Sequence, residues 1–136
     1  MEISTTPDTE QLMNDYLAVR RGDLSKLAVL SESFIFSHPL GNIHGPDELV
    51  SMQEELKEAF PDEELTVENM LVGDDIAMWE WTLSGTHEGE WQDFPPTSRR
   101  FSITGMSKTV MKDGKIAENW AYYNASDFIA QLEGTE

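Results

Sequence analysis

The sequence contains no cysteine, and this absence removes several kinds of chemistry. Disulfide bonds, thiolate nucleophiles and cysteine-ligated zinc sites are all excluded. Long apolar runs are missing too, since none approaches the roughly 20 residues that a membrane-spanning helix needs. The first residues, MEISTTPDTEQ, lack the basic and apolar regions of a signal peptide, so we expect a cytoplasmic protein.

Positive charge is scarce. Nine Lys and Arg stand against 26 Asp and Glu, which gives a net charge of −17. Such a surface repels nucleic-acid phosphates and anionic lipid headgroups, so we expect neither a nucleic-acid nor a membrane partner. The acidic residues are dispersed along the chain rather than gathered in a tail. This pattern favours a halophilic protein, whose self-repulsion is screened by salt; an ordinary acidic protein is the alternative.

The motifs of several common active sites are also missing. There is no Gly-x-Ser-x-Gly turn of a serine hydrolase and no glycine-rich phosphate loop. The three histidines, His38, His44 and His87, form no helical ligand pair, so we expect no metal site.

The chain is long enough for one domain with a core, and no repeat or linker divides residues 1–136. Apolar spacing and stop signals predict helices over 7–22, 24–33, 45–60 and 125–133. Period-two alternation and turn signals predict strands over 34–39, 64–72, 76–91, 101–112 and 115–124. Helices followed by a run of antiparallel strands indicate an α+β fold, with the helices on one face of a curved sheet.

Asp113-Gly114 is the strongest hairpin signal in the sequence. A two-residue turn there pairs Lys112 with Lys115, and alternation then fixes the register of the two strands. The expected pairs are Met111 with Ile116, Thr109 with Glu118, Ser107 with Trp120, Gly105 with Tyr122 and Ile103 with Asn124. This face would combine aromatic bulk with a carboxylate and an amide, as small-molecule pockets do. The alternative is that Glu118 and Asn124 lie at the rim of the sheet and bind backbone or solvent.

In the strand predicted over 76–91, two opposite faces could point toward the core. Glu80 is flanked by Trp79 and Trp81, so either the tryptophans or the carboxylate points inward. Bulk favours the tryptophan pair.

The segments GDLSKLAVLSESFIFSHP, GPDEL, AFPD, GTHEGEWQDFPPTSRRFSITG, KDGKIAENW and FIAQLE follow one another along the chain. Together they resemble the SnoaL-like polyketide cyclases of the nuclear transport factor 2-like superfamily. The resemblance implies a cone-shaped curved antiparallel sheet around helices, with a central pocket and often a homodimer formed by the outer sheet face. It also implies ring closure of an aromatic polyketide by intramolecular aldol condensation, without a metal or organic cofactor. The expected ligand is a small hydrophobic carbonyl compound.

The resemblance further implies a general acid/base Asp four residues after the strand Trp, but this sequence has Asn124 four residues after Trp120. An amide does not titrate near neutral pH, although it can hydrogen-bond a carbonyl or enolate. His38, His87 and Glu118 are the candidates that could supply the missing proton transfer. The expected substrate-binding aromatics are Phe36, Trp79, Trp81, Trp91, Trp120 and Tyr122. The protein is then an acid/base enzyme, a non-catalytic binder of the same fold, or a dimeric interaction module.

Overall fold

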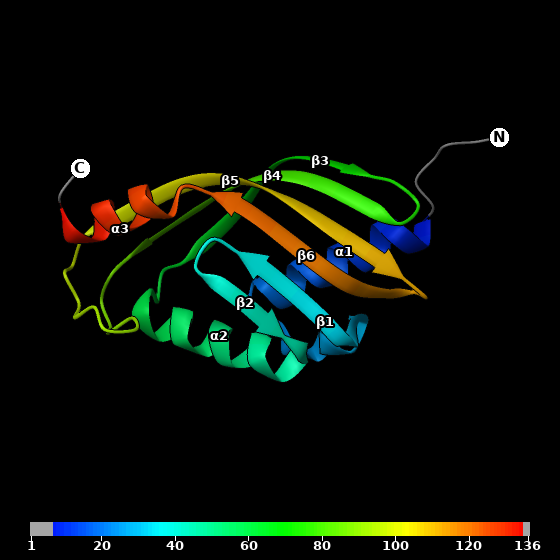
Figure 1. Ribbon diagram of the computed structural model, residues 1–136, viewed down its shortest axis with the longest axis horizontal. Coiled ribbons are helices and arrows are strands. Elements are labelled where there is room, and N and C mark those ends of the chain that lie inside the picture. Colours follow the sequence, from blue (N-terminus) through cyan, green and yellow to red (C-terminus); the bar gives the residue numbers. More distant parts are fainter. Residues whose placement is uncertain (1–6, 135–136) are drawn as a thin grey trace.

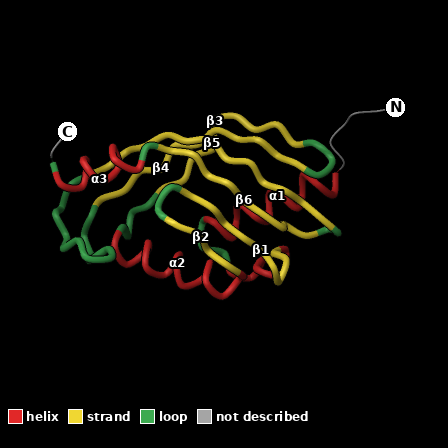
Figure 2. The backbone as a smooth tube through the Cα atoms, viewed as in Figure 1, coloured by secondary structure: helices red, strands yellow, loops and turns green. Residues whose placement is uncertain are grey.

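The computed structural model describes residues 7–134, in which a six-stranded sheet curves around helices (Figure 1). Figure 2 shows helices α1 and α2 beneath the concave side of the sheet and α3 at one end of it. In chain order the elements are α1 (Pro7–Arg20), the 3-10 helix η1 (Leu24–Val29), β1 (Leu30–His38), β2 (Gly41–His44), α2 (Gly45–Ala59), β3 (Glu64–Val72), β4 (Ile76–Thr86), β5 (Arg100–Lys112), β6 (Lys115–Tyr123) and α3 (Ala125–Glu133).

The strands follow the order β2-β1-β6-β5-β4-β3 across the sheet. Neighbouring strands are antiparallel except β1 and β6, which run parallel. The predicted α+β fold with helices against a curved sheet is confirmed, and the parallel pair is its one departure from an antiparallel sheet. Within residues 7–134, no helix combines the length and apolar character needed to cross a membrane.

Apolar side chains at helical spacing explain how α1 packs against the sheet. Met13, Tyr16 and Leu17 share one face of the helix and are buried. The predicted long helix α2 is also present, with Pro46 in its first turn and the His44 amide donating to Glu48 Oε1 at 2.8 Å.

The segment between these helices was predicted less well. The helix expected over 24–33 is a short 3-10 helix that ends at Val29, and β1 begins at Leu30 instead of Phe34. The edge strand β2, only 4 residues long, was not predicted. Pairing of Leu30 with Ile116 of β6 overrides the weak helical pattern of 30–33, because tertiary contacts outweigh local propensity.

The β5–β6 hairpin begins as predicted and then changes register. Asp113 and Gly114 both have positive φ, 53° and 72°, as a type I′ turn requires, and Lys112 pairs with Lys115. Met111 pairs with Ile116, but Val110 pairs with Glu118, so Ala117 is the extra residue of a β-bulge.

The register predicted beyond the bulge is therefore wrong by one residue. Thr109 pairs with Asn119, Ser107 with Ala121 and Gly105 with Tyr123, while β6 ends before Asn124. Because side chains alternate, this single insertion exchanges the two faces of β6.

Candidate functional site

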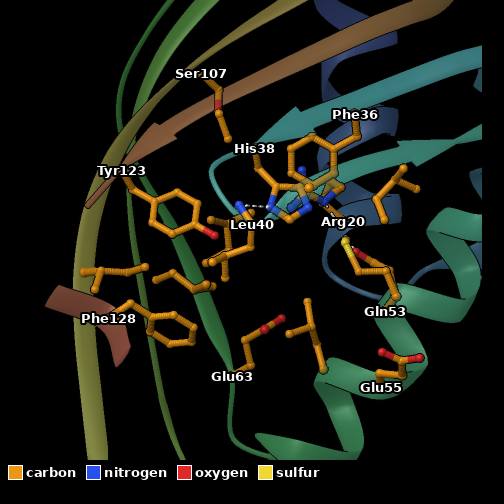
Figure 3. A pocket seen from close by; sticks show the side chains of 18 of the residues that line it. Arg20, Phe36, His38, Leu40, Gln53, Glu55, Glu63, Ser107, Tyr123 and Phe128 are labelled. Carbon is orange, nitrogen blue, oxygen red and sulfur yellow. Dashed lines mark hydrogen bonds between the residues drawn. The ribbon is translucent and has the colours of Figure 1, made fainter. Parts of the chain in front are cut away.

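A cavity of about 340 Å³ lies between the concave face of the sheet and helices α1 and α2 (Figure 3). This volume is in the lower part of the range of small-molecule sites, about 300–1,000 Å³. Apolar and aromatic residues make most of the wall: Phe36, Leu40, Ile43, Met52, Leu56, Leu65, Trp79, Trp81, Leu83, Trp91, Ile103, Ala121, Tyr123 and Phe128. The polar lining residues include Arg20, His38, Gln53, Glu63 and Ser107.

The tryptophan pair of β4 faces this cavity, as the bulk argument predicted. Trp79 and Trp81 are 2% and 5% exposed, whereas Glu80 points to the other face and accepts a hydrogen bond from Asn69 Nδ2 at 2.7 Å. Each indole N–H donates to a hydroxyl on β5: Trp79 to Thr109 at 3.0 Å and Trp81 to Ser107 at 2.9 Å. These bonds fix the orientation of both rings.

Four of the six aromatic residues expected to bind substrate line the cavity: Phe36, Trp79, Trp81 and Trp91. Trp120 and Tyr122 do not, because the bulge at Ala117 turns them to the outer face of the sheet. Tyr122 is 59% exposed, and the Lys108 ammonium lies 5.5 Å from the centre of the Trp120 ring. The prediction that these two rings face a hollow is wrong.

Glu118 and Asn124 also lie away from the cavity wall. Glu118 shares the outer face with Trp120 and accepts a hydrogen bond from its indole N–H at 2.9 Å. Asn124 is exposed and is the N-cap of α3, where its side-chain oxygen accepts from the Asp127 amide at 3.0 Å. The amide therefore has a structural partner that explains its presence without a substrate.

In place of Glu118, the bulge turns Asn119 inward. Asn119 is fully buried, and its Oδ1 accepts a hydrogen bond from the Thr109 hydroxyl at 2.7 Å. Because that hydroxyl itself accepts from the Trp79 indole, the three side chains form one hydrogen-bonded series. Its side-chain amide Nδ2 has no hydrogen-bond partner among the described residues. Sequence reasoning missed this residue because alternation without the bulge assigns it to the outer face.

Arg20, at the end of α1, lines the cavity and was not predicted. Its Nε donates to Gln53 Oε1 at 3.4 Å, its Nη1 donates to the Tyr16 hydroxyl at 3.2 Å, and its Cζ lies 4.5 Å from the Phe36 ring centre. A signal was present in the sequence, because Arg20 follows Met13 by seven residues and Tyr16 by four, on the buried face of the helix.

Glu63, just before β3, lines the cavity together with Glu48 and Glu55 of α2, and sequence reasoning identified none of these three carboxylates as site residues. The Oε2 of Glu63 is buried and has no hydrogen-bond partner within the described residues. Burial raises the pKa of Glu63 above its ordinary value of 4.5, and the Arg20 charge opposes this shift without cancelling it. Figure 3 shows Glu63 and Tyr123 pointing into the same space. Nothing in the local sequence distinguishes Glu63 from its acidic neighbours.

His38, at the end of β1, is the predicted proton-transfer residue that lines the cavity. Its Nδ1 accepts a hydrogen bond from the Leu40 amide at 3.3 Å. Burial, with the Arg20 charge second, lowers the pKa of His38 below 6.5, so the ring is neutral at pH 7. With Nδ1 accepting, the proton of the neutral ring lies on Nε2, which makes His38 a hydrogen-bond donor.

The other predicted histidine lies in the core. His87 is fully buried, its ring centre is 5.4 Å from that of Phe60, and its Nδ1 is 3.2 Å from the Thr97 hydroxyl. It is not among the residues that line the cavity, although its Nε2 has no partner within the described part of the chain. Tyr123, in contrast, does line the cavity, and burial raises its pKa to about 12, so its phenol stays protonated.

No metal-binding cluster is found in the described residues, where no three His, Asp or Glu side chains gather in a way that could hold an ion. The titratable and cationic groups of the cavity are instead spread over α1, β1, α2, β6 and the segment before β3, with Glu48 and Glu55 both on α2. An arrangement of separated polar groups in an apolar wall can orient a carbonyl compound and move a proton on it.

The sequence profile of the SnoaL-like polyketide cyclases matches residues 10–132. None of the curated proteins matches this chain.

Several solved structures share the fold. A protein from Jannaschia sp. CCS1, assigned as a SnoaL-like polyketide cyclase, is 17% identical with a TM-score of 0.82, covering 96% of this chain and 97% of its own. TsrD from Streptomyces laurentii is 25% identical with a TM-score of 0.80, covering 98% of this chain and 99% of its own. IdmH from Streptomyces antibioticus, assigned as a polyketide cyclase, is 24% identical with a TM-score of 0.74, covering 94% of this chain and 99% of its own.

Proposed function

This chain belongs to the SnoaL-like polyketide cyclase family, and from that membership we propose that it is an acid/base enzyme acting on a small hydrophobic carbonyl compound. The observation that carries the proposal is the unpartnered Glu63 carboxylate oxygen in the wall of a largely apolar cavity. A carboxylate kept from water with an elevated pKa is a stronger base than one in solution.

The proposed reaction is an intramolecular aldol closure. Glu63 accepts a proton from the carbon next to a carbonyl, and the enolate carbon bonds to a second carbonyl carbon of the same molecule. The resulting alkoxide takes the proton back from Glu63, so the product is an isomer of the substrate and no co-reactant is consumed. His38 Nε2–H and the Tyr123 hydroxyl are the donors that would orient the carbonyl oxygens.

Proton exchange tests this proposal without knowledge of the natural substrate. 2-Tetralone and phenylacetone in D₂O should exchange their α-protons faster with the protein than in buffer, as followed by NMR. The Glu63→Gln variant should lose roughly 10²-fold of that rate or more, because it cannot accept a proton. Glu64→Gln, which neutralises the adjacent exposed carboxylate at the start of β3, is the matched control and should keep the rate.

A non-catalytic small-molecule binder of the same fold is the second candidate. The specific observation in its favour is Asn124, which stands where the family resemblance implies the catalytic Asp and which caps α3 here. Ketones that bind, by quenching of the cavity tryptophans, yet show no exchange above the buffer rate would favour this function over the first.

We also propose that the outer face of the sheet joins two copies of the chain. Exposed apolar side chains gather there from neighbouring strands: Leu71, Ile76, Met78, Met106 and Tyr122. Sedimentation equilibrium should give a dimer for the wild type and a monomer for Leu71→Lys combined with Tyr122→Lys. A monomeric wild type at the same concentration would count against the interface.

A further inference from the structure

Arg20 is a cavity cation that forms no close ion pair with any of the described residues. Within the described residues its guanidinium has no carboxylate oxygen within 4.0 Å, and the two ion pairs found there use Lys26 and Arg100. Its hydrogen bonds go to the neutral oxygens of Gln53 and Tyr16. A guanidinium has five N–H donors, so these two bonds leave most of its donor capacity unused. A partly buried charge in this state lacks the partner that usually offsets its desolvation.

The neighbours of Arg20 hold its guanidinium in one orientation. Gln53, which accepts from Arg20 Nε, is itself fixed by donating Nε2–H to the Val19 carbonyl at 2.6 Å. The Phe36 ring, 4.5 Å from Cζ, supports the flat face of the group. Figure 3 shows Arg20 beside Phe36 and His38 at the cavity wall. A planar donor set held in this way matches a planar two-oxygen anion.

The charge of Arg20 acts on groups that reach the cavity from three different places in the fold. It contributes to the lowered pKa of His38 on β1, and it opposes the raised pKa values of Glu63 before β3 and Tyr123 on β6, where burial is the larger cause. Three carboxylates also line this cavity, those of Glu48, Glu55 and Glu63. Within the described residues none of them lies within 4.0 Å of the Arg20 guanidinium, so its unused N–H donors are available to a bound anion.

We propose that the cavity binds a hydrophobic carboxylate, with the carboxylate on Arg20 and the apolar body against Trp79 and Trp81. This inference rests on the proposed function and narrows it, because the carbonyl compound is then a free acid rather than a neutral ester. Arg20 and Glu63 are not paired with each other, so the substrate's charged group and its reactive carbon can occupy separate parts of the wall. Arg20 is a binding residue in this scheme, and Glu63 keeps the proton-transfer role.

Matched acids and esters test the inference. The probes are benzoic, 2-naphthoic and anthracene-2-carboxylic acids with their methyl esters, titrated by calorimetry and by quenching of tryptophan fluorescence. The best-binding acid should bind the wild type at least about tenfold more tightly than its ester, because a charge-assisted bond is worth that much over a neutral contact. An ester bound as tightly as its acid overturns the inference and leaves the proposed function standing. Binding of neither class throughout the panel overturns both.

Variants of Arg20 test whether this residue causes the preference for acids over esters. Arg20→Gln should bring acid and ester to within about twofold of each other, while Arg20→Lys should keep an intermediate preference because it retains the charge but not the fork of donors. Arg21→Gln is the matched control, since it removes the same charge one residue away, where the side chain is exposed and donates to the Leu65 carbonyl. It should keep the wild-type preference. An acid preference that survives in a folded Arg20→Gln protein, or is lost equally in Arg21→Gln, contradicts the assignment.

Discussion

At the scale of single residues, the fold holds the Glu63 carboxylate in a buried position that disfavours its charged form. Its Oε2 is buried without a partner, and burial raises its pKa above 4.5. The ionisable groups that share its cavity are Arg20 on α1, His38 on β1, Glu48 and Glu55 on α2, and Tyr123 on β6. Of these, the Arg20 cation favours ionised Glu63, and its effect is smaller than that of burial.

The raised pKa has a definite consequence for stability. The folded protein binds the Glu63 proton more tightly than the unfolded chain does, so this group costs stability above its folded pKa and stops doing so as the pH falls below about 4.5. Glu63→Gln should therefore be more stable than wild type at pH 7 to 8, with the difference shrinking toward pH 4. Urea unfolding across this range, with Glu64→Gln as control, measures it. A variant less stable than wild type at neutral pH would show that ionised Glu63 is stabilised by a contact outside this account.

Asn124 stands where the family resemblance implies a catalytic Asp, and its variants distinguish a role in capping α3 from a role in proton transfer. Because its side chain caps α3, Asn124→Ala should lower the free energy of unfolding by about 1 kcal/mol, while Asn124→Asp should keep the cap. Chemical unfolding of the two variants checks this difference. If Asn124→Asp also raises the ketone exchange rate, then position 124 takes part in proton transfer as the family resemblance implies.

At the scale of elements, the bulge in β6 decides which side chains reach the cavity. The hairpin turn was predictable because Asp-Gly has few alternatives, and the pair Met111–Ile116 follows directly from it. Ala117 carries no such signal, yet it exchanges Glu118, Trp120 and Tyr122 for Asn119, Ala121 and Tyr123 on the inner face. The tryptophan pair on β4 was predicted correctly because that prediction used only the alternation within one strand and the bulk of the two rings, and did not depend on the register with a neighbouring strand. Arg20 and Glu63 were missed because their significance depends on tertiary placement.

The close approach of β5 to Trp81 gives a prediction at this scale. A Cβ on Gly105 would overlap the Trp81 ring, far inside van der Waals contact, so Gly105→Ala must displace the indole. The displacement should break the Trp81–Ser107 hydrogen bond and cost about 1–3 kcal/mol of stability through overpacking. Near-ultraviolet circular dichroism and urea unfolding report the two effects. Ser107→Ala, which removes the bond without adding volume, should cost less stability. A Gly105→Ala protein no less stable than Ser107→Ala would refute the steric explanation.

At the scale of the whole molecule, charge is the property that the sequence predicts and the fold leaves uncompensated. Only two ion pairs lie within residues 7–134, and several cations are used elsewhere, as when Arg21 and Lys115 donate to backbone carbonyls. Acidic side chains of like charge also stand one helical turn apart, as Glu54 and Glu58 do on the exposed side of α2. Most of the net charge of −17 is therefore balanced by solvent ions and not by the protein.

Salt should stabilise this protein strongly. Raising NaCl from about 0.1 M to about 1 M shortens the screening length from about 10 Å to about 3 Å, less than the spacing of most surface charges. We expect the Tm to rise by on the order of 10 °C, which corresponds to a few kcal/mol for a domain of this size. Sucrose, which screens no charge, separates this effect from general exclusion of solutes. The triple variant Glu54→Gln, Glu58→Gln and Asp74→Asn should start from a higher Tm at low salt and gain less on salt addition, because less repulsion remains to be screened. An equal rise of Tm with salt in the two proteins would show that salt does not act by screening repulsion between these acidic side chains.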